Sequence, residues 1–153
     1  MEGFADRGGW WVVGQGVLLA AAVGALFSYG EDWGIVAEVA GIVVAAAGGV
    51  QALLGLISLG ESLTPFPAPR SDAALVERGV YRLVRHPIYG GIGLGSAGLG
   101  LFDGNPPAIW VSAALIIYLW AKAGHEEQRL VSHFPDYAGY RTRVRRRLIP
   151  WLI

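Results

Sequence analysis

Four apolar stretches dominate the chain, and short polar segments separate them. We expect each stretch to form a membrane-spanning helix, at about residues 10–29, 33–60, 88–102 and 107–124. The first stretch has twenty residues and no charge, and as a helix it would extend for about 30 Å, the thickness of the hydrocarbon core of a bilayer. The pattern therefore predicts one domain, residues 1–153, that is an all-α integral membrane bundle of four helices in two hairpins.

Charged residues divide the polar segments into two kinds. Ten of the twelve basic residues lie within residues 70–85 and 129–147, whereas the turns after the first and third stretches contain only acidic charges, Glu31, Asp32 and Asp103. Since Lys and Arg are retained on the cytoplasmic side of a membrane, we expect both termini to be cytoplasmic in an inner or plasma membrane. This topology has a cytoplasmic loop at 61–87 and a cytoplasmic C-terminal helical segment within 125–153.

The composition agrees with a membrane protein and excludes several kinds of site. Hydrophobic residues make up 54% of the chain and charged residues 16%, below the roughly 25% of an average soluble domain. The absence of cysteine excludes disulfides, thiolate metal sites and a cysteine nucleophile. The G-x-G-x-x-G match at 93–98 has no preceding strand, so we do not interpret it as a dinucleotide site. We also predict no metal site around His125 and no nucleic-acid partner.

Glycines and a few polar residues inside the apolar stretches indicate how the helices pack. Gly91 and Gly95 form a G-x-x-x-G pair that permits close helix packing, either within the chain, against a ligand or in a homodimer. Gln15, Glu38 and Gln51 lie within predicted spans, where polar residues often mark function. We favour interhelical hydrogen bonds or interface contacts for these three.

Reactive side chains gather in the two predicted cytoplasmic segments. Arg82, Arg85, His86 and Tyr89 have helical spacing, but Pro87 disfavours helix at the residue before it, so we expect a kink at the start of the third span. At the end of the fourth span, Glu126 and Glu127 oppose the helix dipole. Either that helix continues past the two carboxylates or they have basic partners, for which we consider Arg129 and Arg82. Basic clusters alone would also fit contacts with anionic membrane lipids.

The joint pattern is more specific than either segment. RHPIYGG preceded by GVYRLV, then HEEQRL, F-x-x-Y-x-x-Y and a terminal R-x-x-P, over residues 59–151, resembles the isoprenylcysteine carboxyl methyltransferase and phospholipid methyltransferase superfamily. The resemblance implies an S-adenosylmethionine pocket between the last two spans and the C-terminal segment, with a lipophilic acceptor entering from the bilayer. It assigns to this pocket the R-H-P-x-Y element, the acidic pair and the paired tyrosines: Arg85, His86, Pro87, Tyr89, Glu126, Glu127, Tyr137 and Tyr140.

The chemistry of the cofactor fits the same residues. A sulfonium with an ammonium, a carboxylate and ribose hydroxyls requires acidic groups, a basic group and aromatic faces. The full cofactor-binding prediction also includes Tyr81, Arg82 and Gly91, which lie in the quoted segments GVYRLV and RHPIYGG. We expect Arg85 and Glu127 to matter most for catalysis.

The acceptor stays open at this stage. A phospholipid amine, an isoprenylcysteine-like carboxylate and a small lipophilic thiol all fit the sequence. Two other classes of function also remain as alternatives, an NADPH-dependent membrane reductase related to sterol reductases and a non-catalytic lipid-binding membrane protein.

Overall fold

A computed structural model of the chain describes residues 3–28, 30–69 and 73–152, and within these residues it contains helices and no strand. The all-α prediction is therefore confirmed. The predicted end of the first span at Tyr29, the basic residue Arg70 and the last residue, Ile153, lie outside the described residues. The elements in chain order are α1 (Gly9–Ala25), α2 (Ile35–Leu59), η1 (Gly60–Ser62), η2 (Gly79–Arg82), α3 (Pro87–Phe102), α4 (Pro106–His133) and α5 (Tyr137–Arg143).

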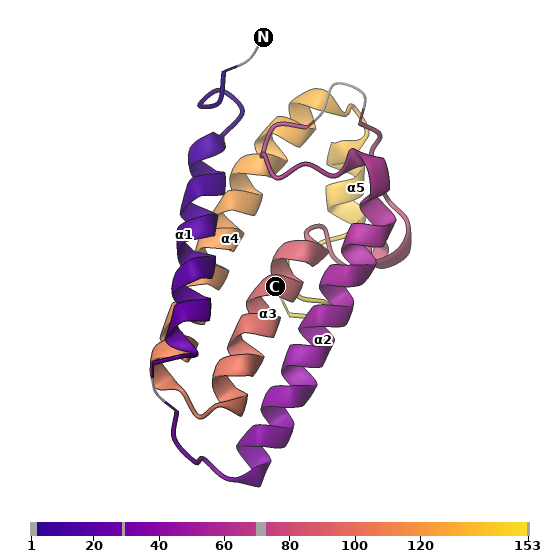
Figure 1. Cartoon of the computed structure of the whole chain (residues 1–153). Helices are drawn as coiled ribbons and strands as arrows, with labels where there is room; N and C mark the ends of the chain where they lie inside the picture. Colours follow the sequence, from indigo (N-terminus) through magenta and orange to yellow (C-terminus); the bar gives the residue numbers. More distant parts are fainter. Residues whose placement is uncertain (1–2, 29, 70–72, 153) are drawn as a thin grey trace.

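The four long helices lie lengthwise in the spatial order α1, α4, α3, α2 (Figure 1). The turns that join α1 to α2 and α3 to α4 lie at the same end, because the backbone N–H of Glu31 donates to the carbonyl of Gly104 at 3.1 Å. The side chain of Asn105 also donates to the carbonyl of Ala25 at 2.9 Å. The chain therefore forms two helical hairpins whose turns contact each other, and the connecting loop and the tail lie at the opposite end.

Glycine determines how α2 packs on α3. Gly41, Gly48 and Gly55 recur every seven residues, which places them on one face of α2. A Cβ on Gly48 would collide with the backbone of α3, and a Cβ on Gly91 would lie 2.5 Å from the carbonyl oxygen of Gly48. Gly91 thus packs α3 against α2, which is one of the alternatives that the G-x-x-x-G pair left open.

The opposite face of α2 carries large apolar side chains at the same interval. Val36, Val43, Val50 and Ile57 are all largely exposed, as expected of residues that contact lipid. Two helices of the described chain, α2 continued through η1 and α4, are long and apolar enough to cross a membrane. With 17 and 16 residues, α1 and α3 are shorter than the about 20 that a span requires, so two of the four predicted spans have the length and composition to cross a membrane.

The ends of α3 and α4 follow from local sequence. Pro87 is the first residue of α3, and His86 before it has a non-helical conformation, so the predicted kink is confirmed. Asn105 caps α4 by accepting a hydrogen bond from the N–H of Ala108 at 2.9 Å. With 28 residues, α4 runs nine positions past the predicted end at 124. A helix of that length extends about 42 Å, so its last turns project beyond a 30 Å core.

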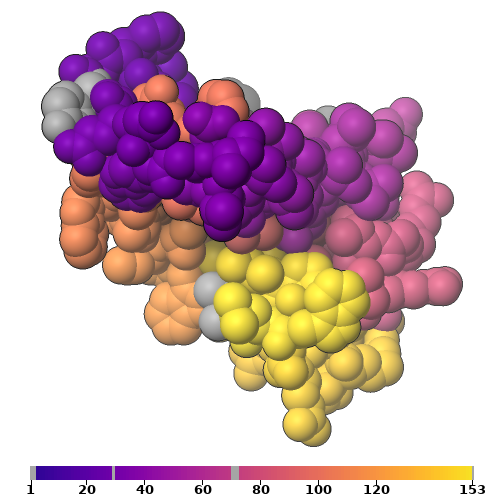
Figure 2. Space-filling model, turned by 90° about the horizontal axis from the view of Figure 1, so that it is seen from below, coloured from indigo at the N-terminus to yellow at the C-terminus, as the bar shows by residue number. Residues whose placement is uncertain are grey.

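The C-terminal segment folds back onto the bundle after α5. The N–H groups of Arg85 and His86 donate to the carbonyls of Arg146 and Arg147 at 3.0 and 2.8 Å. The side chain of Gln51 on α2 donates to the carbonyl of Leu148 in this segment at 2.8 Å. It also donates to the carbonyl of Pro87, the first residue of α3, at 3.0 Å, which is the interhelical contact predicted for Gln51. Figure 2 shows the segment, in yellow, as a mass on one side of the helices with part of α4 next to it.

Candidate functional site

A buried ion cluster joins the start of α3 to the end of α4, the two helix ends that are predicted to lie on the cytoplasmic side. The carboxylate of Glu127, which is 1% exposed, accepts from Arg85 Nε at 2.8 Å, from Arg147 Nη2 at 3.1 Å and lies 3.2 Å from His86 Nε2. Burial alone would raise the pKa of Glu127, but the hydrogen bonds from His86, Arg85 and Arg147 lower it to about 2. This carboxylate is therefore ionised at neutral pH and joins three segments that are distant in the sequence.

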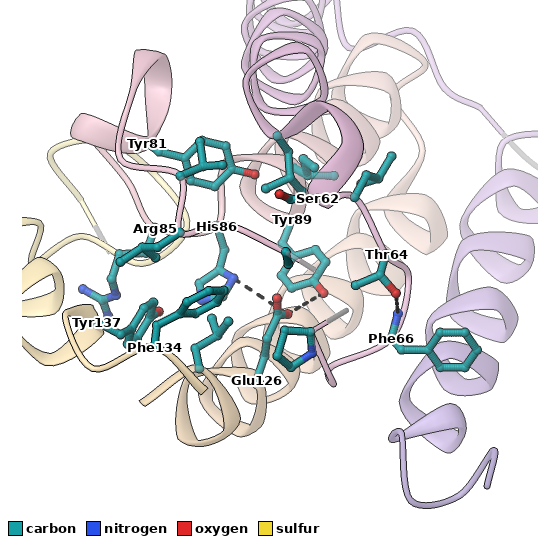
Figure 3. Close-up of a pocket in the computed structure, with 18 of the residues that line it drawn as sticks. Ser62, Thr64, Phe66, Tyr81, Arg85, His86, Tyr89, Glu126, Phe134 and Tyr137 are labelled. Atoms are coloured by element: carbon teal, nitrogen blue, oxygen red, sulfur yellow. Dashed lines mark hydrogen bonds and ion pairs between the residues drawn. The ribbon is translucent and has the colours of Figure 1, made fainter. Parts of the chain in front are cut away.

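Glu126 belongs to a second, more open group. Its Oε2 accepts a hydrogen bond from the hydroxyl of Tyr89 at 2.8 Å and lies 3.9 Å from His86 Nδ1. The rings of His86 and Tyr89 stack in parallel, with centroids 5.5 Å apart. Figure 3 shows Glu126 beside Tyr89 and His86 in the wall of a cavity. His86 thus stands between the two glutamates, of which Glu126 lines the cavity and Glu127 does not.

The cavity lies between the ends of α1, α3 and α4, the loop that follows α2, and α5. It encloses about 990 Å³ of empty space, part of which is open to solvent. One part of its wall is apolar and comprises Leu59, Leu63, Phe66, Ile88, Leu130 and Phe134. Mostly apolar walls with a few polar groups are typical of ligand-binding sites.

Three tyrosines form the side of the cavity nearest the C-terminal segment. Tyr140 donates its hydroxyl to the carbonyl of Tyr81 at 2.7 Å. Burial raises the pKa of Tyr81, Tyr137 and Tyr140 well above the ordinary value, so all three hydroxyls are protonated. The hydroxyl of Tyr137 is buried and has no hydrogen-bond partner among the described residues. An unpaired buried donor costs about 1–3 kcal/mol, which a ligand with an acceptor atom would offset.

Most of the predicted site residues meet in this region. Seven of them line the cavity, namely Tyr81, Arg85, His86, Tyr89, Glu126, Tyr137 and Tyr140, and Glu127 lies directly behind Arg85 and His86. Three do not: Arg82 is exposed outside the cavity, Pro87 is buried at the start of α3, and Gly91 faces α2.

The partners predicted for the acidic pair differ from those observed. Arg129 donates to the backbone carbonyl of Asp6 at 2.6 Å instead of contacting a glutamate. Arg85 and Arg147 take that role, because the kink before α3 and the returning tail bring them to the buried face of α4. The alternative that α4 continues past both glutamates is confirmed.

Several lining residues were not among the predicted site residues. Lys122 on α4 and Gln15 on α1 line the cavity, as does the loop from Ser62 to Val76 where it is described. Lys122 did carry a signal, since it is the one charged residue within the fourth apolar stretch. The terminal R-x-x-P element contains Arg147, whose contact with Glu127 requires the tail to fold back.

Comparison with known proteins identifies the family. The phospholipid methyltransferase family matches residues 36–136, about two thirds of the chain. A comparison with curated proteins gave no match. The matched range includes the kink before α3 and both glutamates, and it agrees with the superfamily resemblance found in the sequence. With this match and two helices apolar enough to cross a bilayer, the chain belongs to the phospholipid methyltransferase family and is a membrane methyltransferase that acts on lipid.

Proposed function

We propose that this protein transfers a methyl group from S-adenosylmethionine to a lipophilic acceptor, a phospholipid amine or an isoprenylcysteine-like carboxylate, within the cavity described above. The observation that carries the proposal is the contact of the R-H-P-x-Y corner with the acidic pair, in which Arg85 Nε lies 2.8 Å from Glu127. This contact aligns Arg85, His86 and Tyr89 along one wall of the cavity.

The residues present fit the polar groups of the cofactor. Arg85 uses its Nε and one Nη1 hydrogen for Glu127 and the carbonyl of Val144, so further guanidinium donors are available for a carboxylate. Glu126 has a second carboxylate oxygen for an ammonium or a hydroxyl, and the Tyr137 hydroxyl has no partner among described residues. When bound, S-adenosylmethionine would supply an electrophilic methyl on a sulfonium, which the face of Phe134 would attract.

The two residues predicted to be catalytic, Arg85 and Glu127, have different roles in this proposal. Arg85 lines the cavity and would bind and orient a carboxylate there. Glu127 does not line the cavity, so we assign it as a positioning residue that holds Arg85 and His86. If the acceptor is an amine, Glu126 is the carboxylate placed to receive its proton. The apolar wall would exclude water from the cavity and help to orient the acceptor.

We further propose that α1 and α3 cross the membrane together with α2 and α4, with both termini in the cytoplasm. The support is the division of charge along the bundle. The end with the cavity has the basic loop and tail, whereas the contacting turns at the other end carry Glu31, Asp32 and Asp103. The cofactor would then enter from the cytoplasm, and the acceptor from the bilayer.

Binding and product analysis test the proposed function. Isothermal titration calorimetry of the purified protein in detergent should detect binding of S-adenosylhomocysteine and no comparable binding of NADPH. Incubation with methyl-labelled S-adenosylmethionine and a total lipid extract should yield one labelled lipid. Binding of NADPH alone would favour a reductase, and binding of neither compound would favour a non-catalytic lipid-binding protein.

A further inference from the structure

A buried lysine lines the cavity and makes no ion-pair contact with a described residue. Lys122 is 1% exposed and lies on α4, one turn before Glu126. Its Nζ donates to the side-chain oxygen of Gln15 at 2.5 Å and to the carbonyl of Pro65 at 3.1 Å, and it lies 5.0 Å from the centroid of the Tyr89 ring. All three contacts are neutral, and among the described residues no carboxylate lies within 4.0 Å of this ammonium group.

The cavity has two ends, and Lys122 lies at one of them. Figure 3 shows Arg85, Phe134 and Tyr137 at one end, and Thr64 and Phe66 at the other, with Glu126 between them. Lys122 belongs to the second end, because it contacts Pro65 and the face of Tyr89. Of the groups that fit the cofactor, Arg85, Phe134 and Tyr137 lie at the first end, so the second end is available to the acceptor.

We propose that Lys122, held by Gln15, binds an anionic group of the methyl acceptor, a phosphodiester or a carboxylate. This inference rests on the proposed function and specifies the chemistry of its acceptor. An ammonium has three donors, of which Gln15 and Pro65 take two. A cation removed from water is stabilised best by a counter-charge in direct contact, and Glu126 acts on Lys122 without such a contact. An anion bound here would supply the counter-charge and accept the third hydrogen bond.

A purely structural role does not explain the charge. A residue that only bridges the Pro65 carbonyl and the Gln15 side chain needs two hydrogen-bond donors. A neutral amide side chain would provide them without the cost of desolvating an ammonium group. A neutral acceptor, such as a small lipophilic thiol, would leave Lys122 with no counter-charge in contact, since Glu126 acts on it only from beyond 4.0 Å. The site therefore selects acceptors whose polar head carries a negative charge next to a lipid chain.

Two matched pairs of ligands test the proposal on the purified protein in detergent. The first pair is N-acetyl-S-farnesylcysteine and its methyl amide, which differ in the carboxylate. The second is oleoyl lysophosphatidylethanolamine and monooleoylglycerol, which differ in the phosphodiester headgroup. Dissociation constants are measured by thermal shift with and without S-adenosylhomocysteine. We expect the wild type to prefer the anionic member of at least one pair by about tenfold or more, the worth of a charge-assisted hydrogen bond. The pair that shows the preference identifies which anion the site takes.

Variants assign the preference to the lysine. Lys122→Gln should reduce the preference to less than about threefold, because the neutral amide retains donors but no charge. Gln15→Glu should do the same while leaving Lys122 in place, since the new carboxylate would pair with it. Arg82→Gln removes an exposed basic residue outside the cavity and serves as the control that keeps the preference.

The outcomes separate this proposal from the proposed function. Equal affinities within both pairs in the wild type would overturn the role of Lys122, as would a preference that both site variants retain. If Lys122→Gln does not fold, Gln15→Glu and the wild type decide the question. Failure of S-adenosylhomocysteine to bind would instead contradict the proposed methyltransferase function, because the acceptor affinities are also measured without it.

Discussion

Replacing each glutamate of the acidic pair by glutamine should separate stability from ligand binding. In the Glu127→Gln variant the side chain keeps its shape but loses its charge. The guanidinium of Arg85, whose side chain is 6% exposed, then remains buried without a counter-charge, and Arg147 loses its partner as well. Removing one member of a buried ion pair costs about 3–5 kcal/mol. We expect the free energy of unfolding to fall by that amount.

The neighbouring Glu126→Gln variant is the matched control. The Glu126 side chain is 21% exposed, and its one hydrogen bond from a described residue, from Tyr89, can be kept by an amide oxygen. The free energy of unfolding should therefore change by less than about 1 kcal/mol. The affinity for S-adenosylhomocysteine should nevertheless fall by about tenfold, because a cavity-lining charge is lost.

Unfolding in mixed detergent micelles, followed by tryptophan fluorescence, measures the first quantity, and titration calorimetry measures the second. The reasoning would be refuted if Glu127→Gln unfolded at the wild-type free energy. It would also be refuted if Glu126→Gln lost as much stability as its neighbour, because the two carboxylates would then not have separate roles.

Three further predictions follow from the packing and the charges. The pKa of Glu127 is lowered from 4.5 to about 2, so its stabilising contribution is complete above pH 4.5 and is lost as the pH falls towards 2. The difference in free energy of unfolding between the wild type and Glu127→Gln should therefore shrink as the pH falls from 4.5 towards 2. A difference that stays constant over this range would contradict the pairing of Glu127 with its basic partners. Gly91→Ala should disrupt the packing of α3 on α2 and lower the melting temperature, whereas Gly95→Ala, whose Cβ meets nothing within 4 Å, should leave it unchanged or raised. Asn105→Ala should cost about 1–2 kcal/mol in the same unfolding assay, since it removes the cap of α4, and an unchanged value would contradict the capping role.

Much of the architecture could be predicted because it depends on local sequence. Apolar runs specify the long helices, Pro87 specifies where α3 begins, and the acidic turns specify that the hairpins point the same way. The lengths were harder to predict, since polarity after residue 124 does not end a helix. α4 continues to His133 because its buried face still has partners, including Glu127 and the tail.

The site was predictable in its membership but not in its internal arrangement. Neighbouring residues on a helix point about 100° apart, so one glutamate of the pair must face the ion cluster while the other faces the cavity. The sequence does not indicate which, and Glu127 was expected to be the catalytic one. The contacts of Arg147 and Lys122 depend on long-range folding, of the tail onto α3 and of α1 onto α4, which no local pattern specifies.

The pairing of residues 85 and 86 with 146 and 147 makes one wall of the cavity depend on contacts between distant parts of the sequence. The helices α3, α4 and α5 all lie between the two partners in the sequence, so this wall is complete only when the segment after α5 has folded back onto the start of α3. A proteolytic cut just after α5 would therefore open the cavity at this wall while leaving the helices themselves intact.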